Sequence, residues 1–279
     1  LMLRRVVGLA PEVLIRISHV LGCWLLLGVV ALELRFLFAA LADHYNAWRW
    51  LGWVLVPCAF LMLMSMRRAL PWPIAAYPRE YRSYAALPIA VLLLGWFWLV
   101  NLLSDGSADP LPYVPLINPL ELGMLIVLFA VQRWAQDGLA VLAIKPEQLR
   151  RATQVVIGAS MFALLTMMVC RTAVHWGQVP FQADALVGSQ LVQAGLSIVW
   201  TLIALGLTIT GHLRVRRDLW MVGAALIGVV VVKLFFVDLG NSGSLERIIS
   251  FIGVGVLLLV VGYFAPLPPR RETKAQVPA

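Results

Sequence analysis

Two apolar runs in the last quarter of the sequence, joined by a short polar turn, most restrict what this chain can fold into. Residues 219–237 and 248–265 each have about the 17–25 residues that a helix needs to cross a bilayer core. Lys233 is the only side chain within either run that hydrocarbon strongly rejects. Because lipid satisfies no backbone polar group, each run is predicted to be a membrane-spanning helix.

The rest of the chain has the same character. Of its 279 residues, 61% are hydrophobic and 13% are charged, about half the charged share of a soluble domain. Six further apolar runs precede the two already described: 17–41, 50–66, 85–103, 120–134, 152–170 and 185–211. The sequence therefore predicts an all-α fold, a polytopic transmembrane helical bundle of about eight spans that forms a single domain over residues 1–279.

The segments between the predicted spans are alternately rich and poor in lysine and arginine, so these residues gather on one side of the predicted bundle. Seventeen of the 22 fall on one side, in the N-terminal segment, in the second, fourth and sixth links and in the C-terminal tail. Three fall on the other side, and Arg35 and Lys233 lie within spans. By the positive-inside rule, both termini are predicted to be cytoplasmic. This placement accounts for the net charge of +8. No nucleic acid partner is predicted, because the sequence has no basic patch interleaved with the aromatic residues that stack on bases.

Local signals predict where some helices begin, bend or touch. Asn118 followed by Pro119 is typical of a helix cap and first residue. Asp184 is expected to cap the run 185–211, and Pro57 is expected to kink the run 50–66. Five glycines of the last two spans are predicted to pack against neighbouring helices: Gly223, Gly228, Gly253, Gly255 and Gly262.

In the predicted orientation, ionisable side chains near the membrane gather toward the non-cytoplasmic face. We expect a polar cavity that opens to this face and binds or processes an anionic envelope lipid or glycan, because cations there neutralise phosphate or carboxylate. The candidate substrate-binding residues are Arg35, Glu121, Arg171, Lys233 and Arg247. The candidate catalytic residues are Glu33, His175 and Asp238, since burial moves the titration of a carboxyl or imidazole toward neutral pH.

Other chemistry has less support in the sequence. No HxxxH or HExxH pair, Walker loop or GxGxxG motif is present, so neither a metal nor a cofactor is predicted. Cys23, Cys58 and Cys170 follow no CxxC spacing and are expected to be small packing residues.

Two other classes of function stay open. A transporter or channel module requires water access from both faces, whereas the cytoplasmic halves of the spans are almost uncharged. A structural subunit of an envelope assembly predicts that the membrane charges pair internally or extend to the interface. Surrounding membrane lipids are the partners that the sequence implies, and it decides neither enzymatic activity nor oligomeric state.

Three stretches carry a resemblance to a known family: NPLELG at 118–123, RTAVHWGQVPF at 171–181, and KLFFVDLGNSGSLERIISFIGVGVLLLVVGYFAPLPP at 233–269. They resemble the C-terminal part of a bacterial inner-membrane family, domain of unknown function 2339, most specifically over residues 218–269. The resemblance implies a multi-pass protein of the bacterial inner membrane. It also implies that this chain is the C-terminal portion of a longer protein, and it brings no established reaction.

Overall fold

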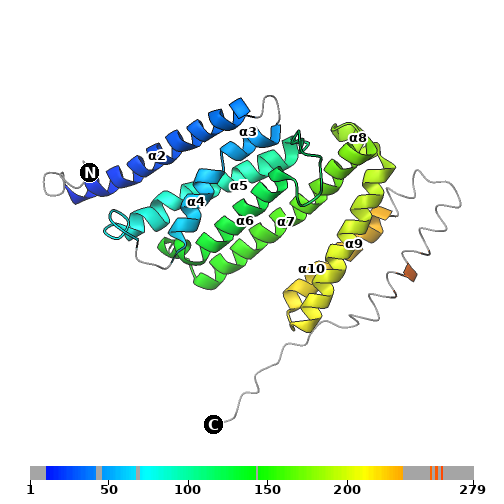
Figure 1. The fold of residues 1–279 in the computed structure, drawn as a ribbon. Helices are drawn as coiled ribbons and strands as arrows, with labels where there is room; N and C mark the ends of the chain where they lie inside the picture. Colours follow the sequence, from blue (N-terminus) through cyan, green and yellow to red (C-terminus); the bar gives the residue numbers. More distant parts are fainter. Residues whose placement is uncertain are drawn as a thin grey trace, which may run out of the picture. The chain divides into compact units, whose positions relative to one another are not determined.

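The computed structural model describes residues 11–41, 46–66, 70–142 and 144–234, together with residues 252, 255, 256 and 259. This described part is helical and contains no strand. It divides into two compact units, residues 1–172 and 173–279. The single domain that the sequence predicts over residues 1–279 stays a prediction. The elements in chain order are α2 (Glu12–Leu41), α3 (Asn46–Gly52), α4 (Leu55–Met64), the π-helical η1 (Glu80–Ala85), α5 (Ala86–Leu103), α6 (Pro119–Gly138), the 3₁₀ turn η2 (Leu139–Val141), α7 (Pro146–Gly177), α8 (Ala183–Gly188), α9 (Gln190–Leu213) and α10 (Arg217–Lys233) (Figure 1).

Five helical segments of the described chain have the length and apolar character to cross a membrane: Glu12–Phe38, Glu80–Leu103, Pro119–Val141, Pro146–Gly177 and Gln190–Leu213. The predicted all-helical membrane architecture is thereby confirmed. A shorter apolar stretch, Trp50–Met64, and the 17-residue α10 occupy the positions of two more predicted spans. The predicted run 248–265 lies outside the described residues except for four positions, so the count of eight stays a prediction.

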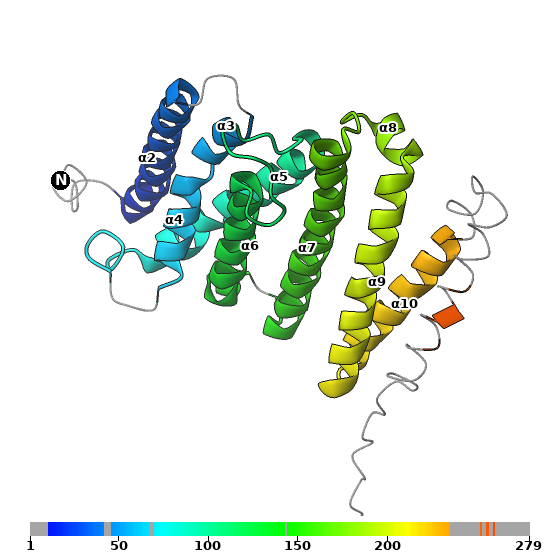
Figure 2. The ribbon, with the colours of Figure 1, turned by 45° about the vertical axis from the view of Figure 1, so that its right-hand side comes forward.

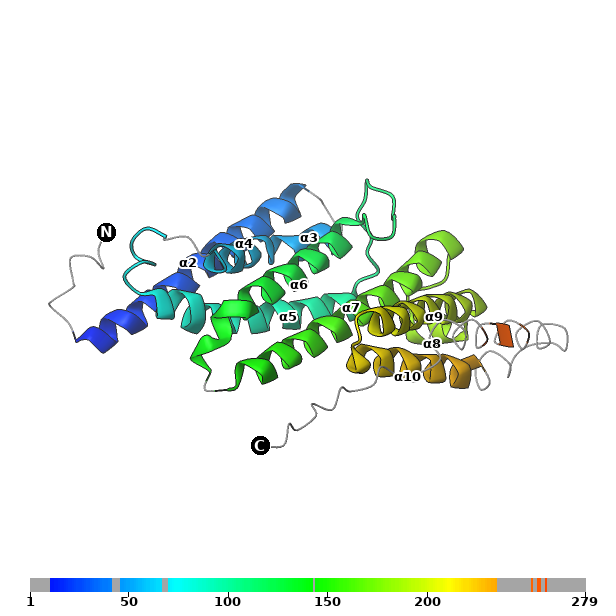
Figure 3. The same cartoon turned by 90° about the horizontal axis from the view of Figure 1, so that it is seen from below.

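The core of the first unit lies between α4, α5 and α6. Leu61 of α4, Phe97 of α5 and Leu128 of α6 are buried there. Figures 1 and 3 show α5 and α6 running side by side, which brings these faces together. Val91 and Leu92 of α5 are exposed, as lipid-facing side chains of a membrane helix are expected to be.

α2 is attached to the start of the α5 helix by polar contacts. Arg16 forms an ion pair of 3.2 Å with the buried Glu80, and His19 Nδ1 lies 2.9 Å from the Tyr81 hydroxyl. The His19 ring also lies against Tyr77, with ring centroids 4.3 Å apart. These contacts fix one end of α2 against η1. This end lies on the side that the distribution of lysine and arginine predicts to be cytoplasmic.

Two of the predicted spans are interrupted. The run 50–66 breaks between α3 and α4, and Pro57 lies in the first turn of α4, where its missing N–H costs no helical hydrogen bond. The break therefore replaces the predicted kink. The run 185–211 breaks at Ser189, whose hydroxyl accepts a hydrogen bond from the Val192 N–H. The prediction that Asp184 caps this long helix is wrong, because Asp184 lies in the first turn of the separate α8.

In the second unit, α9 and α10 form a hairpin in which glycine allows close approach (Figure 2). A Cβ atom added to Gly223 would lie 2.8 Å from the Ala204 carbonyl oxygen and 2.8 Å from the Thr208 nitrogen. Small residues let membrane helices pack at this distance, and the predicted packing role of Gly223 is confirmed. Gly228 has no described atom close to the position of a Cβ, and the predicted last span lies mostly outside the described residues, so the packing role of Gly228 stays a prediction.

Candidate functional site

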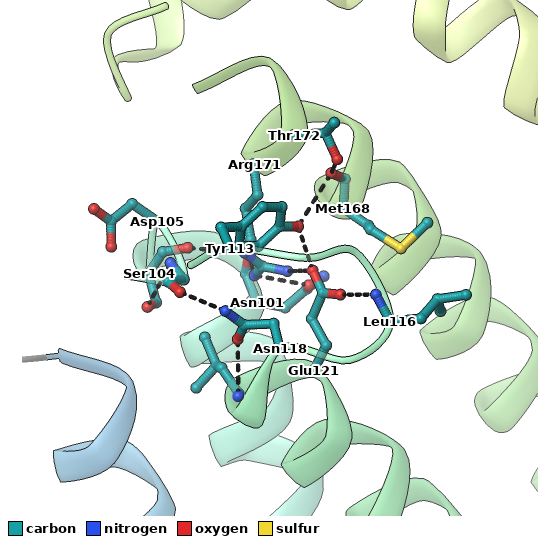
Figure 4. A network of polar contacts seen from close by, with 12 residues as sticks. Asn101, Ser104, Asp105, Tyr113, Leu116, Asn118, Glu121, Met168, Arg171 and Thr172 are labelled. Atoms are coloured by element: carbon teal, nitrogen blue, oxygen red, sulfur yellow. Dashed lines mark hydrogen bonds and ion pairs between the residues drawn. The ribbon is translucent and has the colours of Figure 1, made fainter. Parts of the chain in front are cut away.

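The start of α6 is built on Asn118. Its Oδ1 accepts a hydrogen bond of 2.9 Å from the Leu120 N–H, and Pro119 follows as the first helical residue, as predicted. Its Nδ2 donates to the Gly106 carbonyl oxygen at 2.8 Å. Gly106 has a φ of +81°, a conformation that favours glycine. Asn118 therefore caps α6 and also folds the link between α5 and α6 back onto the helix (Figure 4).

Glu121 lies in the first turn of α6 and is completely buried. One carboxylate oxygen accepts from the Tyr113 hydroxyl at 2.6 Å, and the other accepts from the Leu116 N–H at 2.7 Å. Leu116 holds a positive φ of 67°, so this backbone donor is presented by a turn of unusual conformation. A carboxylate in the first turn also interacts favourably with the positive end of the helix dipole.

Arg171 reaches the same place from α7 and is also completely buried. Its Nε donates to the Ser104 carbonyl at 3.1 Å, and its Nη2 donates to the Asn101 carbonyl at 2.9 Å and to Asn101 Oδ1 at 3.2 Å. Its Nη1 forms an ion pair of 3.6 Å with Glu121 Oε1. Arg171 thus occupies the negative end of α5, where carbonyl groups lack helical partners.

Together these residues form a junction of three helices. The cation of Arg171 lies at the C-terminal end of α5, and the anion of Glu121 lies at the N-terminal end of α6. We call Asn101, Tyr113, Asn118, Glu121 and Arg171 the junction network (Figure 4). Among the described residues, two of its buried donors have no hydrogen-bond acceptor: Asn101 Nδ2, and Arg171 Nη1, whose contact with Glu121 is the longer ion pair of 3.6 Å. Such groups are costly to bury, so they mark the position at which an acceptor would be favoured.

The pKa of the Tyr113 phenol is raised above its ordinary range, first by burial and second by its hydrogen bond to Glu121. A raised phenol pKa means that the folded state favours the neutral form. The stability that it contributes is present below the unfolded-state pKa of about 10 and is lost as the pH rises above that value.

Tyr113→Phe is therefore expected to cost stability at pH 7, by about 1.5–3 kcal/mol for a lost hydrogen bond to a charged group. The difference from the native chain should shrink between about pH 10 and pH 11, because the variant lacks this titration. Denaturant unfolding across pH 7–11 measures both effects. Tyr84→Phe, which removes an exposed tyrosine hydroxyl, is the matched control. A difference that stays constant with pH would contradict this account of Tyr113.

The structure brings two of the predicted site residues together, Glu121 and Arg171. Glu33 and Arg35 lie on α2, with Glu33 exposed and the Arg35 guanidinium 5.2 Å from the Trp53 ring centroid. His175 lies in the second unit, as does Lys233, whose ammonium donates to the Gln193 carbonyl at 2.9 Å and to Ser197 Oγ at 2.8 Å. Two predicted site residues, Asp238 and Arg247, lie outside the described residues.

Two members of the junction network, Asn101 and Tyr113, were not predicted from the sequence as site residues. Asn101 ends an apolar run that is otherwise almost free of polar side chains, which is a signal for an interhelical hydrogen bond. Tyr113 lies in a proline-rich link and carries no comparable signal. Within the part of the chain that the structure describes, no three His, Cys, Asp or Glu side chains are grouped closely enough to hold a metal ion.

The fold and this network define an all-helical membrane protein whose buried polar groups join helix ends. Comparison of the sequence with protein families agrees with this class: residues 1–268 match the family described as "Predicted membrane protein (DUF2339)". The chain belongs to this family, and the resemblance of its C-terminal stretches to it is confirmed. No curated protein and no solved structure matches the chain.

Proposed function

We propose that this chain is a structural module of a multi-pass inner-membrane protein in a bacterial envelope, with eight spans and both termini in the cytoplasm. The observation that carries the structural role is the junction network. It places the buried charges Glu121 and Arg171 against each other and against the ends of α5 and α6. Buried charges that are paired and hydrogen-bonded in this way fix one arrangement of helices.

The other described cations near the predicted outer face also have contacts within the chain. Arg35 lies over the Trp53 ring, and Lys233 donates to two groups of α9. Each contact joins two helical segments: α2 to the break before α4, and α10 to α9. This pattern supports a module that holds its helices in a fixed arrangement for assembly with other envelope components.

The purified protein tests this role. Arg171→Lys is expected to lower the midpoint of thermal unfolding by several degrees. Lysine keeps the charge but lacks the planar guanidinium group that donates hydrogen bonds to the Asn101 and Ser104 carbonyl oxygens. The lipids and glycans that co-purify, identified by mass spectrometry, should be unchanged. A variant of native stability that has released a stoichiometric lipid or glycan would contradict the structural role.

A second candidate function has one observation in its favour. Asn101 Nδ2 has no hydrogen-bond acceptor among the described residues, and Arg171 Nη1 has only its ion pair with Glu121 there. Both donors would suit an anionic oxygen of an envelope lipid or glycan. In this hypothesis, Arg171 binds the substrate beside Glu121. The other candidates, Arg35, Lys233 and Arg247 for binding and Glu33, His175 and Asp238 for acid–base chemistry, stay predictions from the sequence. Release of such a molecule by Arg171→Lys is the result that would favour it.

A further inference from the structure

A groove lies between the C-terminal end of α6 and the N-terminal half of α7. Its volume is about 820 Å³, within the range of about 300–1,000 Å³ that small-molecule sites occupy. The connection between α6 and α7 borders it, at the lower end of both helices in Figure 2. Glu121 and Gln136 mark the two ends of α6, about 22 Å apart at the rise of an α-helix, so this α6–α7 groove is separate from the junction network.

The lining of the α6–α7 groove is amphipathic. Leu139, Leu149 and Ile157 contribute apolar surface, and polar lining comes from three glutamines and a threonine, Gln132, Gln136, Gln154 and Thr153. Gln136 Oε1 accepts a hydrogen bond of 2.7 Å from Arg133 Nη1, which leaves the Gln136 amide N–H groups as donors. A ligand with polar acceptor oxygens at one end and hydrocarbon at the other matches this lining.

The charges around the groove favour an anion. One guanidinium, Arg150, and one carboxylate, Asp137, line it. Three further cations, Arg133, Lys145 and Arg151, and one further carboxylate, Glu147, belong to the same connection and its flanking helix turns, which leaves a net positive charge. This end of α6 and α7 is the basic end that the sequence places at the cytoplasmic interface, and basic pockets between membrane helices on that side suit anionic lipid headgroups.

We propose that the α6–α7 groove binds the headgroup of an anionic phospholipid from the surrounding leaflet. Arg150 neutralises the phosphate, and the glutamine amides donate to its oxygens. The acyl chains continue along Ile157 and Gly158, where Gly158 has no other atom close to the position of a Cβ. This inference does not depend on the proposed structural role of the junction network, because it uses none of its residues.

Native mass spectrometry tests the proposal on the full chain reconstituted in nanodiscs with equal amounts of phosphatidylglycerol and phosphatidylcholine. After extraction into a mild detergent, the protein is expected to retain one phosphatidylglycerol in preference to phosphatidylcholine. Arg150→Gln should weaken this retention about fivefold, the effect of about 1 kcal/mol per basic residue at a membrane surface. Arg151→Gln removes the neighbouring arginine, which does not line the groove. It leaves the direct contact between Arg150 and the phosphate in place, so it should weaken retention clearly less than Arg150→Gln does.

A second pair of variants tests the groove without changing charge. Gly158→Leu is expected to fill the space next to the acyl chains and to reduce phosphatidylglycerol retention. Gly95→Leu adds the same side chain to an open position on α5 and should leave retention unchanged. Equal loss in Arg150→Gln and Arg151→Gln would show diffuse surface attraction and would overturn the proposal. Equal retention of the two lipids, or native retention in Gly158→Leu, would also overturn it.

Discussion

Arg171→Met is expected to lower the free energy of unfolding in detergent micelles by about 3–5 kcal/mol. The substitution leaves the Glu121 carboxylate buried beside an apolar side chain, without the cation that now lies 3.6 Å away. It also removes the donors to the Ser104 and Asn101 carbonyls at the end of α5. Unfolding by a denaturing detergent, followed by circular dichroism, measures the loss.

Arg151→Gln is the matched control for this substitution, since Arg151 lies on the same helix and is exposed. Its effect should stay within about 0.5 kcal/mol, as for most exposed positions. If both variants unfolded at the same denaturant concentration as the native chain, the buried guanidinium would contribute nothing to the joining of α5, α6 and α7.

Gly223→Leu is expected to separate α9 from α10 and to cost about 3 kcal/mol, the upper part of the usual range for overpacking. Even the first atom of a new side chain would overlap the Ala204 carbonyl oxygen and the Thr208 nitrogen, and backbone atoms cannot rotate away. Denaturing-detergent titration of the full chain, with a fluorophore pair on α9 and α10, reports both the stability and the separation of the two helices.

Gly228→Leu is the control on the same helix. Gly228 has open space around it in the described part of the chain. Leucine also has a higher helix propensity than glycine, which lies about 0.8–1 kcal/mol below alanine on this scale. This variant is expected to be as stable as the native chain or more stable. Equal destabilisation by the two substitutions would mean that the loss comes from leucine in α10 in general and not from contact with α9.

The membrane helices could be predicted from the sequence because their signal is local. An apolar run of sufficient length is helical in lipid whatever its neighbours are, and Asn118 with Pro119 marks a helix start within two residues. The breaks before Leu55 and at Ser189 could not be predicted in this way. A glycine precedes each break, Gly52 and Gly188. Glycine is also common within continuous membrane helices, so the glycine alone does not show where a helix ends.

The junction network was predictable only in part. Alternation of charge placed Glu121 and Arg171 on the same side of the membrane, but it did not say which helices are neighbours. The bonds that fix Arg171 reach Ser104 and Asn101, which are 67 and 70 residues away in the chain. Such pairings depend on where the Arg171 side chain of α7 meets the C-terminal end of α5, and no local pattern in the sequence encodes this position.

A double-mutant cycle between Glu121 and Arg171 tests the central claim most directly. It needs the unfolding free energies of the native chain, Glu121→Gln, Arg171→Met and the variant that carries both changes. We predict a coupling energy of about 2–3 kcal/mol, with the double variant more stable than the sum of the single losses implies, because the pair then leaves no uncompensated buried charge. A coupling energy near zero would show that the two charges do not stabilise each other and would contradict the structural role proposed for them.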